Sequence, residues 1–395
     1  MKIKHFLFTA VFAVSTICLH AQDNLVNSLK TNKSDSSKQK FRFTEIINLE
    51  NTSIKNQGSS GTCWSYSTTS FLESEMIRMG KPPVDLSPIY TARCAYIEKG
   101  KNYVRMHGAV SLGDGGESHD VINMYRKYGA IPQSVYSGLN YGTTINKFGE
   151  LSAVMEGILK AVVENRNGQI TPNWLAAYTA AIDAYLGKVP DSFTYQGKIY
   201  TPQTFAQQVV GINPDDYIEF SSFTDHPYYK KFTLLVPDNW SFDQVYNLQL
   251  NDVTAIIDHA LKNGYTVAWA TDVSEKGFSW NNGVAFVPEV PYDEMTAKQR
   301  DEMFNGPKPE MKITPEARQQ AFDNYSTTDD HGMHIVGLAK DQNGKEYYIV
   351  KNSWGPSNDY KGYIYVTKAF VQYKTTAFLL HKSAIPQDIL KKIGI

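Results

Sequence analysis

The stretch "NQGSSGTCWSYSTTSFLESEMIRMG", residues 56–80, places Cys63 directly after a loop of small residues. The positions that follow at the spacing of one helix face are Trp64, Thr68, Phe71, Leu72, Met76 and Met79, and Gly80 ends the run. Cys63 is therefore predicted in the first turn of a helix, where unpaired N–H groups and the helix dipole stabilise a thiolate. From this stretch alone, a nucleophile and a buried core side chain remain equal alternatives.

Composition limits the classes of protein to be considered. The chain has 395 residues, 42% of them hydrophobic and 13% aromatic, which is typical of a globular protein. Its formal net charge is −1, so nothing favours nucleic acid or an anionic membrane as a partner.

The N-terminus has the pattern of an export signal. Basic "MKIKH" precedes the apolar run "FLFTAVFAVSTICL", and a cleavage site follows Ala21. Residues 1–21 are therefore predicted to be a signal peptide, and the protein periplasmic or secreted. A lipoprotein acylated at Cys18 is an alternative, but Ile17 is bulky for such a site. No other segment approaches the roughly 20 apolar residues of a membrane span, so stable membrane insertion is not expected.

Removal of the signal leaves two cysteines, Cys63 and Cys94. They could form one disulfide, but two cysteines supply no disulfide framework for an exported chain. Cys94 lies in "IYTARCAYI", which resembles an apolar helix face, and is expected in the core.

A thiolate needs a base and an orienting group, and residues 329–355, "DDHGMHIVGLAKDQNGKEYYIVKNSWG", supply candidates. Two strand-like runs joined by "DQNG" predict a hairpin. His331 stands at its mouth and His334 inside the strand, on the opposite face, which argues against one metal ion binding both. Asn352 is expected at the same end as His331, with Trp354 covering their hydrogen bond.

The segments "NQGSSGTCWSY", "DHGMHIVGL" and "KNSWG" resemble the three signatures of papain-like cysteine peptidases. The resemblance implies Cys63 as nucleophile, His331 as general base, Asn352 as its orienting residue and Gln57 as an oxyanion donor. The remaining matches, expected at the substrate cleft, are Gly115, Gly116, Trp64 and Trp354.

Several longer segments resemble the bleomycin hydrolase and aminopeptidase C branch, among them "SSFTDHPYYKKF" and "VPDNWSFDQVYNLQL". This implies an α+β fold of two lobes, with a helical insertion. The predicted parts are a signal peptide (1–21), a flexible N-terminal arm (22–41), a helical lobe with the nucleophile helix (42–140), a mostly helical insertion (141–250) and a β-barrel-like lobe with the catalytic His and Asn (251–395).

The expected activity is peptide hydrolysis through a thioester, with peptide or protein substrates and with no cofactor or metal. Relatives of this branch carry a C-terminal arm that favours trimming from a free N-terminus, and no such arm is recognisable before Ile395. Aminopeptidase and endopeptidase specificity therefore both remain open. Further alternatives are a catalytically silent peptide-binding homologue and an acyltransferase on the same residues. The branch also implies a homo-oligomer, a ring of six subunits.

Overall fold

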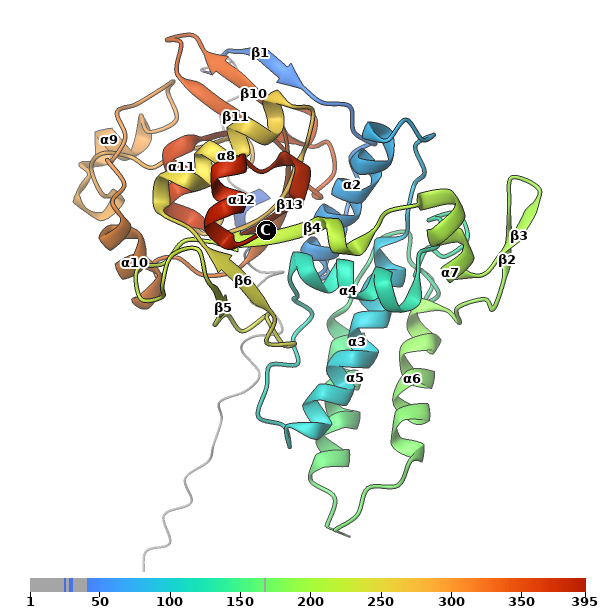
Figure 1. Ribbon diagram of the computed structural model, residues 1–395. Coiled ribbons are helices and arrows are strands. Elements are labelled where there is room, and N and C mark those ends of the chain that lie inside the picture. The colour runs from blue at the N-terminus through green and yellow to red at the C-terminus, as the bar shows by residue number, and fades with distance from the viewer. Residues whose placement is uncertain (1–24, 26–27, 31–40, 167) are drawn as a thin grey trace, which may run out of the picture.

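The computed structural model describes residues 25, 28–30, 41–166 and 168–395. The chain folds into a helical lobe and a lobe built on a large sheet, and α2 (Cys63–Arg78) lies where the two meet (Figure 1). The predicted α+β fold of two lobes is thereby confirmed. The predicted signal peptide and most of the predicted arm lie outside the described residues.

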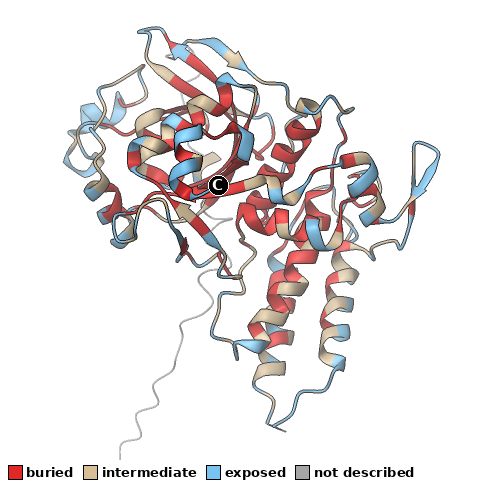
Figure 2. Ribbon diagram, in the orientation of Figure 1, coloured by how far each residue is buried: buried red, intermediate tan, exposed pale blue. Residues whose placement is uncertain are grey.

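Helix α2 is the centre of the molecule. Fourteen of its residues are buried, so it is enclosed on nearly all sides rather than on one face (Figure 2). Two helices of the helical lobe pack on it, α3 (Pro88–Arg105) and α4 (Ser118–Tyr128). Helices α5 (Gly149–Val163) and α6 (Asn173–Leu186) pack on α3 and on each other, and the short α7 (Pro202–Phe205) lies beside β3. Their apolar faces form one continuous core with α2.

The second lobe is an eleven-stranded sheet ordered β5-β6-β4-β13-β7-β10-β11-β12-β9-β8, with β1 paired to β10. The strands are β1 (Phe43–Asn48), β4 (Tyr217–Ser221), β5 (Lys231–Thr233), β6 (Gln244–Asn247), β7 (Val267–Thr271), β8 (Phe278–Ser279), β9 (Val284–Ala285), β10 (His331–Asp341), β11 (Glu346–Lys351), β12 (Tyr363–Thr367) and β13 (Thr375–His381). A separate hairpin joins β2 (Phe193–Tyr195) to β3 (Lys198–Tyr200).

Strand β10 is the longest strand and lies against α2. Its first half pairs antiparallel with β7, and its second half pairs antiparallel with β1. It also forms the predicted antiparallel hairpin with β11. Ten of its eleven residues are buried because both faces of the strand are covered.

Helices cover the sheet on its other side: α8 (Leu250–Lys262), α9 (Ala297–Asp301), α10 (Pro315–Asp323), α11 (Lys368–Lys374) and α12 (Gln387–Ile393). The apolar residues of α8 and α11 enter a second core with β7, β10 and β13. Within the described part of the chain, none of the helices is long and apolar enough to cross a bilayer.

The predicted helical insertion, residues 141–250, differs from the structure in its second half. Helices α5 and α6 account for its first half, but the chain then enters strands and short turns. Strands β4 and β6 join the large sheet, where β4 pairs with β13 from the far end of the chain. The buried run Ile218–Ser221 satisfies its backbone hydrogen bonds by pairing with β13 on one side and with β6 on the other.

Candidate active site

Cys63 is the first residue of α2, as the sequence predicts, with Thr62 at the N-cap. The Thr62 side chain does not cap the helix; its hydroxyl lies 2.6 Å from that of Ser60 instead. The thiol therefore sits beside backbone N–H groups that have no intrahelical partner, the environment that favours a thiolate. Neither Cys63 nor Cys94 forms a disulfide, and burial raises the pKa of Cys94 to about 12.

His331 and Asn352 meet at the open end of the β10–β11 hairpin, where His331 Nε2 lies 2.8 Å from Asn352 Oδ1. Oδ1 is the acceptor, because the Ser353 backbone N–H also donates to it at 2.7 Å. Nε2 therefore carries the ring proton. Nδ1 is left with a lone pair, and it is buried without a hydrogen-bond partner among the described residues. This imidazole can take up a proton.

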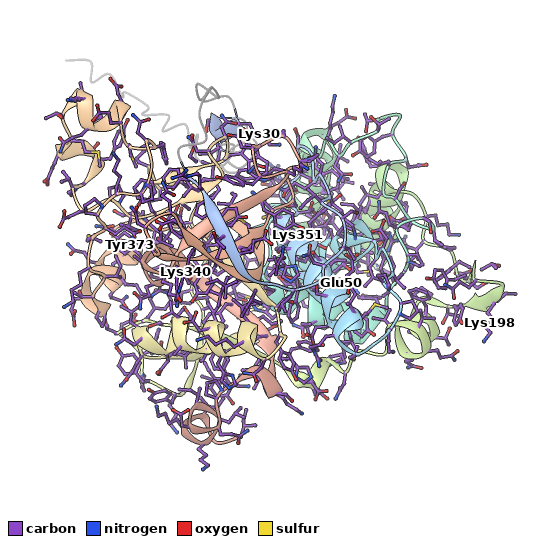
Figure 3. All side chains as sticks on the ribbon, turned by 90° about the horizontal axis from the view of Figure 1, so that it is seen from above. Lys30, Glu50, Lys198, Lys340, Lys351 and Tyr373 are labelled. Atoms are coloured by element: carbon purple, nitrogen blue, oxygen red, sulfur yellow. The ribbon has the colours of Figure 1, made fainter. Side chains whose placement is uncertain are left out.

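His331 is 3% exposed and lies against an aromatic ring. The Trp354 ring lies over the imidazole, with 4.6 Å between the ring centroids. Burial lowers the pKa of His331 to about 4, the Asn352 hydrogen bond opposes this, and the charge of Lys30 lowers it further. Lys30, labelled in Figure 3, places its Nζ 5.8 Å from the Trp354 ring centroid. The imidazole is thus held neutral until a negative charge forms beside it.

The start of β10, which carries His331, packs on the first turns of α2, which begins at Cys63. A methyl group added at Gly332 would lie 3.0 Å from Trp64 Cα, so the residue after His331 packs on the residue after Cys63. His334 faces the same helix further along, with its Nδ1 3.0 Å from Ser70 Oγ. His334 is fully buried and has a structural contact only.

Gln57 lies in the loop before α2. Its Nε2 donates to Ser60 O at 2.7 Å, and its Oε1 accepts from Ser353 Oγ at 2.6 Å. The amide is therefore fixed at both ends. Its second N–H remains available to an oxyanion beside Cys63.

The two predicted cleft glycines adjoin Trp64. The Trp64 Nε1 donates to Asp114 O at 3.0 Å, and a methyl group on Gly116 would lie 2.9 Å from the Trp64 ring. Trp64 and Trp354 are only 3% and 1% exposed, and their part in substrate binding stays a prediction. They are enclosed by the core, where Trp64 supports the glycine loop and Trp354 covers the imidazole.

The sequence analysis missed Ser353 and three carboxylates near the site, those of Glu117, Asp238 and Asp329. Ser353 lies inside the quoted "KNSWG", and the acids lie in "GDGGESHD", "VPDNWSF" and "TTDDH". Each of these four residues lies within or beside a segment that the sequence analysis had already singled out. Their roles depend on partners more than 50 residues away in the chain, which no local pattern reveals.

Comparisons with known proteins agree with this geometry. The model of the Peptidase C1-like family matches residues 188–394, and that of the papain family of cysteine proteases matches residues 43–213. The chain is 25% identical to aminopeptidase C of Lactobacillus delbrueckii subsp. lactis over 92% of its own length and 86% of the relative. It is 21% identical to the mitochondrial cysteine proteinase 1 of Saccharomyces cerevisiae YJM789, over 94% and 83%.

Among solved structures, the fold resembles PepW from Lactobacillus rhamnosis HN001. The two share 21% sequence identity with a TM-score of 0.71, over 94% of this chain and 91% of the other. The likeness therefore spans both lobes.

Proposed function

Because the chain belongs to the Peptidase C1-like family, in the aminopeptidase C and bleomycin hydrolase branch of papain-like cysteine peptidases, we propose that it cleaves peptide bonds through a thioester on Cys63. One observation carries the assignment of residues. It is the 2.8 Å hydrogen bond between His331 and Asn352, on a strand that packs on the helix beginning at Cys63. If Cys63 were only a core side chain, the buried His331–Asn352 hydrogen bond beside its helix would have no chemical role.

The proposed chemistry follows from the groups present. His331 Nδ1 takes the proton of Cys63, and Asn352 holds the imidazolium that forms. The thiolate attacks the substrate carbonyl, and the oxyanion receives hydrogen bonds from Gln57 Nε2 and the Cys63 backbone N–H. His331 then gives its proton to the leaving amine. Water, deprotonated by His331, cleaves the thioester and restores the thiol.

The test is Cys63→Ala in the full mature chain, measured with fluorogenic peptides. Hydrolysis should fall to the background rate while circular dichroism and the unfolding midpoint stay close to the wild type. A thiol-reactive epoxide should label the wild type at Cys63, since burial keeps Cys94 in its thiol form. Cys94→Ala is the matched control and should keep both labelling and turnover.

Near-normal hydrolysis by Cys63→Ala would contradict the assignment. Labelling of the wild type without any hydrolysis would instead favour the silent peptide-binding homologue, and an assay with amine acceptors would reveal an acyltransferase. Export and assembly into six subunits stay predictions. The N-terminal pattern supports the first, and the family resemblance supports the second.

A further inference from the structure

An excess of carboxyl groups lies beside the proposed catalytic residues. The carboxyl groups are those of Asp114, Glu117, Asp120, Glu219, Asp238 and Asp329. The basic side chains in the same region are Lys99 and His119. Both bases are already engaged. Lys99 Nζ donates to the carbonyls of Gly113 and Gly115, and His119 is paired with Glu219 at 2.6 Å. More negative than positive groups are therefore enclosed here.

Three of these carboxyls come together from different parts of the chain. Glu117 precedes α4 in the helical lobe, Asp238 lies between β5 and β6, and Asp329 stands two residues before His331. The electrostatic influence of Asp329 reaches both other groups. Asp238 and Asp329 are half-buried and so still reach solvent.

Glu117 is the unusual member. It is 1% exposed, and its carboxyl is hydrogen-bonded to the carboxyl of Asp329. Its two oxygens have no further hydrogen-bond partner among the described residues. The group that its carboxyl faces is another carboxyl, that of Asp329. A buried carboxylate in this position is stable only if it is protonated or if a cation lies beside it.

The pKa values reflect this conflict. Burial raises the pKa of Glu117 well above its ordinary value, and repulsion from Asp329 adds to it. Burial likewise raises the pKa of Asp238 to about 7, with Asp329 adding and Lys99 opposing. A positive group entering from outside would relieve the repulsion and offer these carboxyls charge-assisted hydrogen bonds.

The cluster adjoins both halves of the catalytic site. The carboxylate of Asp238 lies directly against Gly115, where an added methyl group would be 1.8 Å from its Oδ2. Gly116, next in the chain, packs on the ring of Trp64, the neighbour of Cys63. On the other side, Asp329 is two residues from the base. The cluster thus adjoins the loop beside Trp64 and the segment that leads to His331.

We propose that Glu117, Asp238 and Asp329 form a subsite for a positively charged group of the peptide substrate. This inference rests on the proposed peptidase function. Among the described residues, no group of three or more His, Cys, Asp or Glu side chains is arranged to hold a metal ion. The proposed ligand is an organic cation of the substrate, either its free α-ammonium or a basic side chain.

The experiment uses four sets of peptides built on one neutral sequence. The first set has a free N-terminus, and the second has an acetylated N-terminus. The third set is acetylated and carries one lysine, placed in turn at each position before the cleaved bond; the fourth carries norleucine in place of that lysine. For the wild type, kcat/KM should be about tenfold higher for a cationic peptide than for its neutral match, the scale of a charge-assisted hydrogen bond. Preference for the free N-terminus identifies the α-ammonium, and preference for lysine over norleucine identifies a side chain.

Glu117→Gln and Asp329→Asn should each reduce the cationic-to-neutral ratio toward one. The exposed Glu302→Gln and Asp359→Asn serve as controls and should leave that ratio unchanged. If a cluster variant fails to fold, the wild-type comparison of lysine with norleucine and of free with acetylated peptides still decides the question.

Wild-type hydrolysis of all sets at equal rates would overturn this inference and leave the proposed function standing. So would equal losses on cationic and neutral peptides in the cluster variants. Absence of hydrolysis for every peptide would overturn the proposed function, and the subsite with it.

Discussion

Ser353 connects the two polar arms of the proposed site. Its backbone N–H donates to Asn352 Oδ1, and its hydroxyl donates to Gln57 Oε1 at 2.6 Å. One residue therefore holds the amide that orients the base and the amide that meets the oxyanion. Loss of the hydroxyl would free the Gln57 side chain to rotate, while the backbone contact to Asn352 would persist.

Ser353→Ala should therefore lower kcat by about tenfold and change KM little, because the affected hydrogen bond forms to the transition state. Gln57→Ala should cost more, about 10²–10³ in kcat, since the donor itself is lost. Steady-state kinetics on one fluorogenic peptide measures both. Ser353→Thr keeps the hydroxyl and should retain more activity than Ser353→Ala; equal losses in the two variants would argue against the positioning role.

At the scale of single residues, the sequence predicted those site residues that lie inside short motifs. Cys63, His331, Asn352 and Gln57 stand inside short motifs, and the structure brings His331 to Asn352 and Gln57 to the loop before α2. The role of Ser353 could not be predicted, because its partner lies 296 positions away.

Strand β10 and helix α2 are the two elements whose contact sets the distance between base and nucleophile. Gly332 lies at their closest approach. An added methyl group there would lie 2.8 Å from Ser67 Oγ and 3.0 Å from Trp64 Cα. Since the second neighbour is backbone, the strand itself must move away from the helix.

Gly332→Ala should thus reduce kcat/KM by roughly 10²-fold, the cost of misplacing a catalytic group by about 1 Å. Overpacking should lower the free energy of unfolding by only about 1–3 kcal/mol. Peptide kinetics and urea unfolding test the two effects together. Gly157→Ala, at an open position of α5, is the control and should keep full activity. A fully active Gly332→Ala would mean that this contact does not position His331.

Elements formed by neighbouring segments were predictable, and elements completed by distant ones were not. The hairpin of β10 and β11 follows from alternation and the turn "DQNG". Strand β4 falls within the segment predicted as helical. Its partner is β13, where Leu379 pairs with Glu219, 160 residues earlier in the chain (379 − 219 = 160). Sheet pairing at that range leaves no periodic signal in either segment.

Across the whole molecule, polar contacts join the two lobes beside the site. Lys351 of β11, labelled in Figure 3, donates to Thr52 O at 2.6 Å, on the segment that leads to α2. On the other side, His119 of α4 is paired with Glu219 of β4 at 2.6 Å, and its second ring nitrogen lies 3.2 Å from Asn239 Oδ1. This ion pair is buried between the lobes.

The His119 pair should make the stability of the whole molecule depend on pH. Burial lowers the pKa of His119, but the charge of Glu219 outweighs it and raises the pKa to about 10. In the unfolded chain the ordinary value is about 6.5. A raised pKa means that the stabilisation is complete below about pH 6.5 and is lost as the pH rises through the folded value near 10.

His119→Gln should lower the free energy of unfolding by about 3–5 kcal/mol at pH 6, because it leaves Glu219 buried without a counter-charge. It should also remove much of the loss of stability between pH 7 and pH 10. Urea unfolding at pH 6, 8 and 10 measures both effects, with the half-buried His226→Gln as control. If the free energy of unfolding of His119→Gln depended on pH as that of the wild type does, the His119–Glu219 pair would not be the source of the pH dependence.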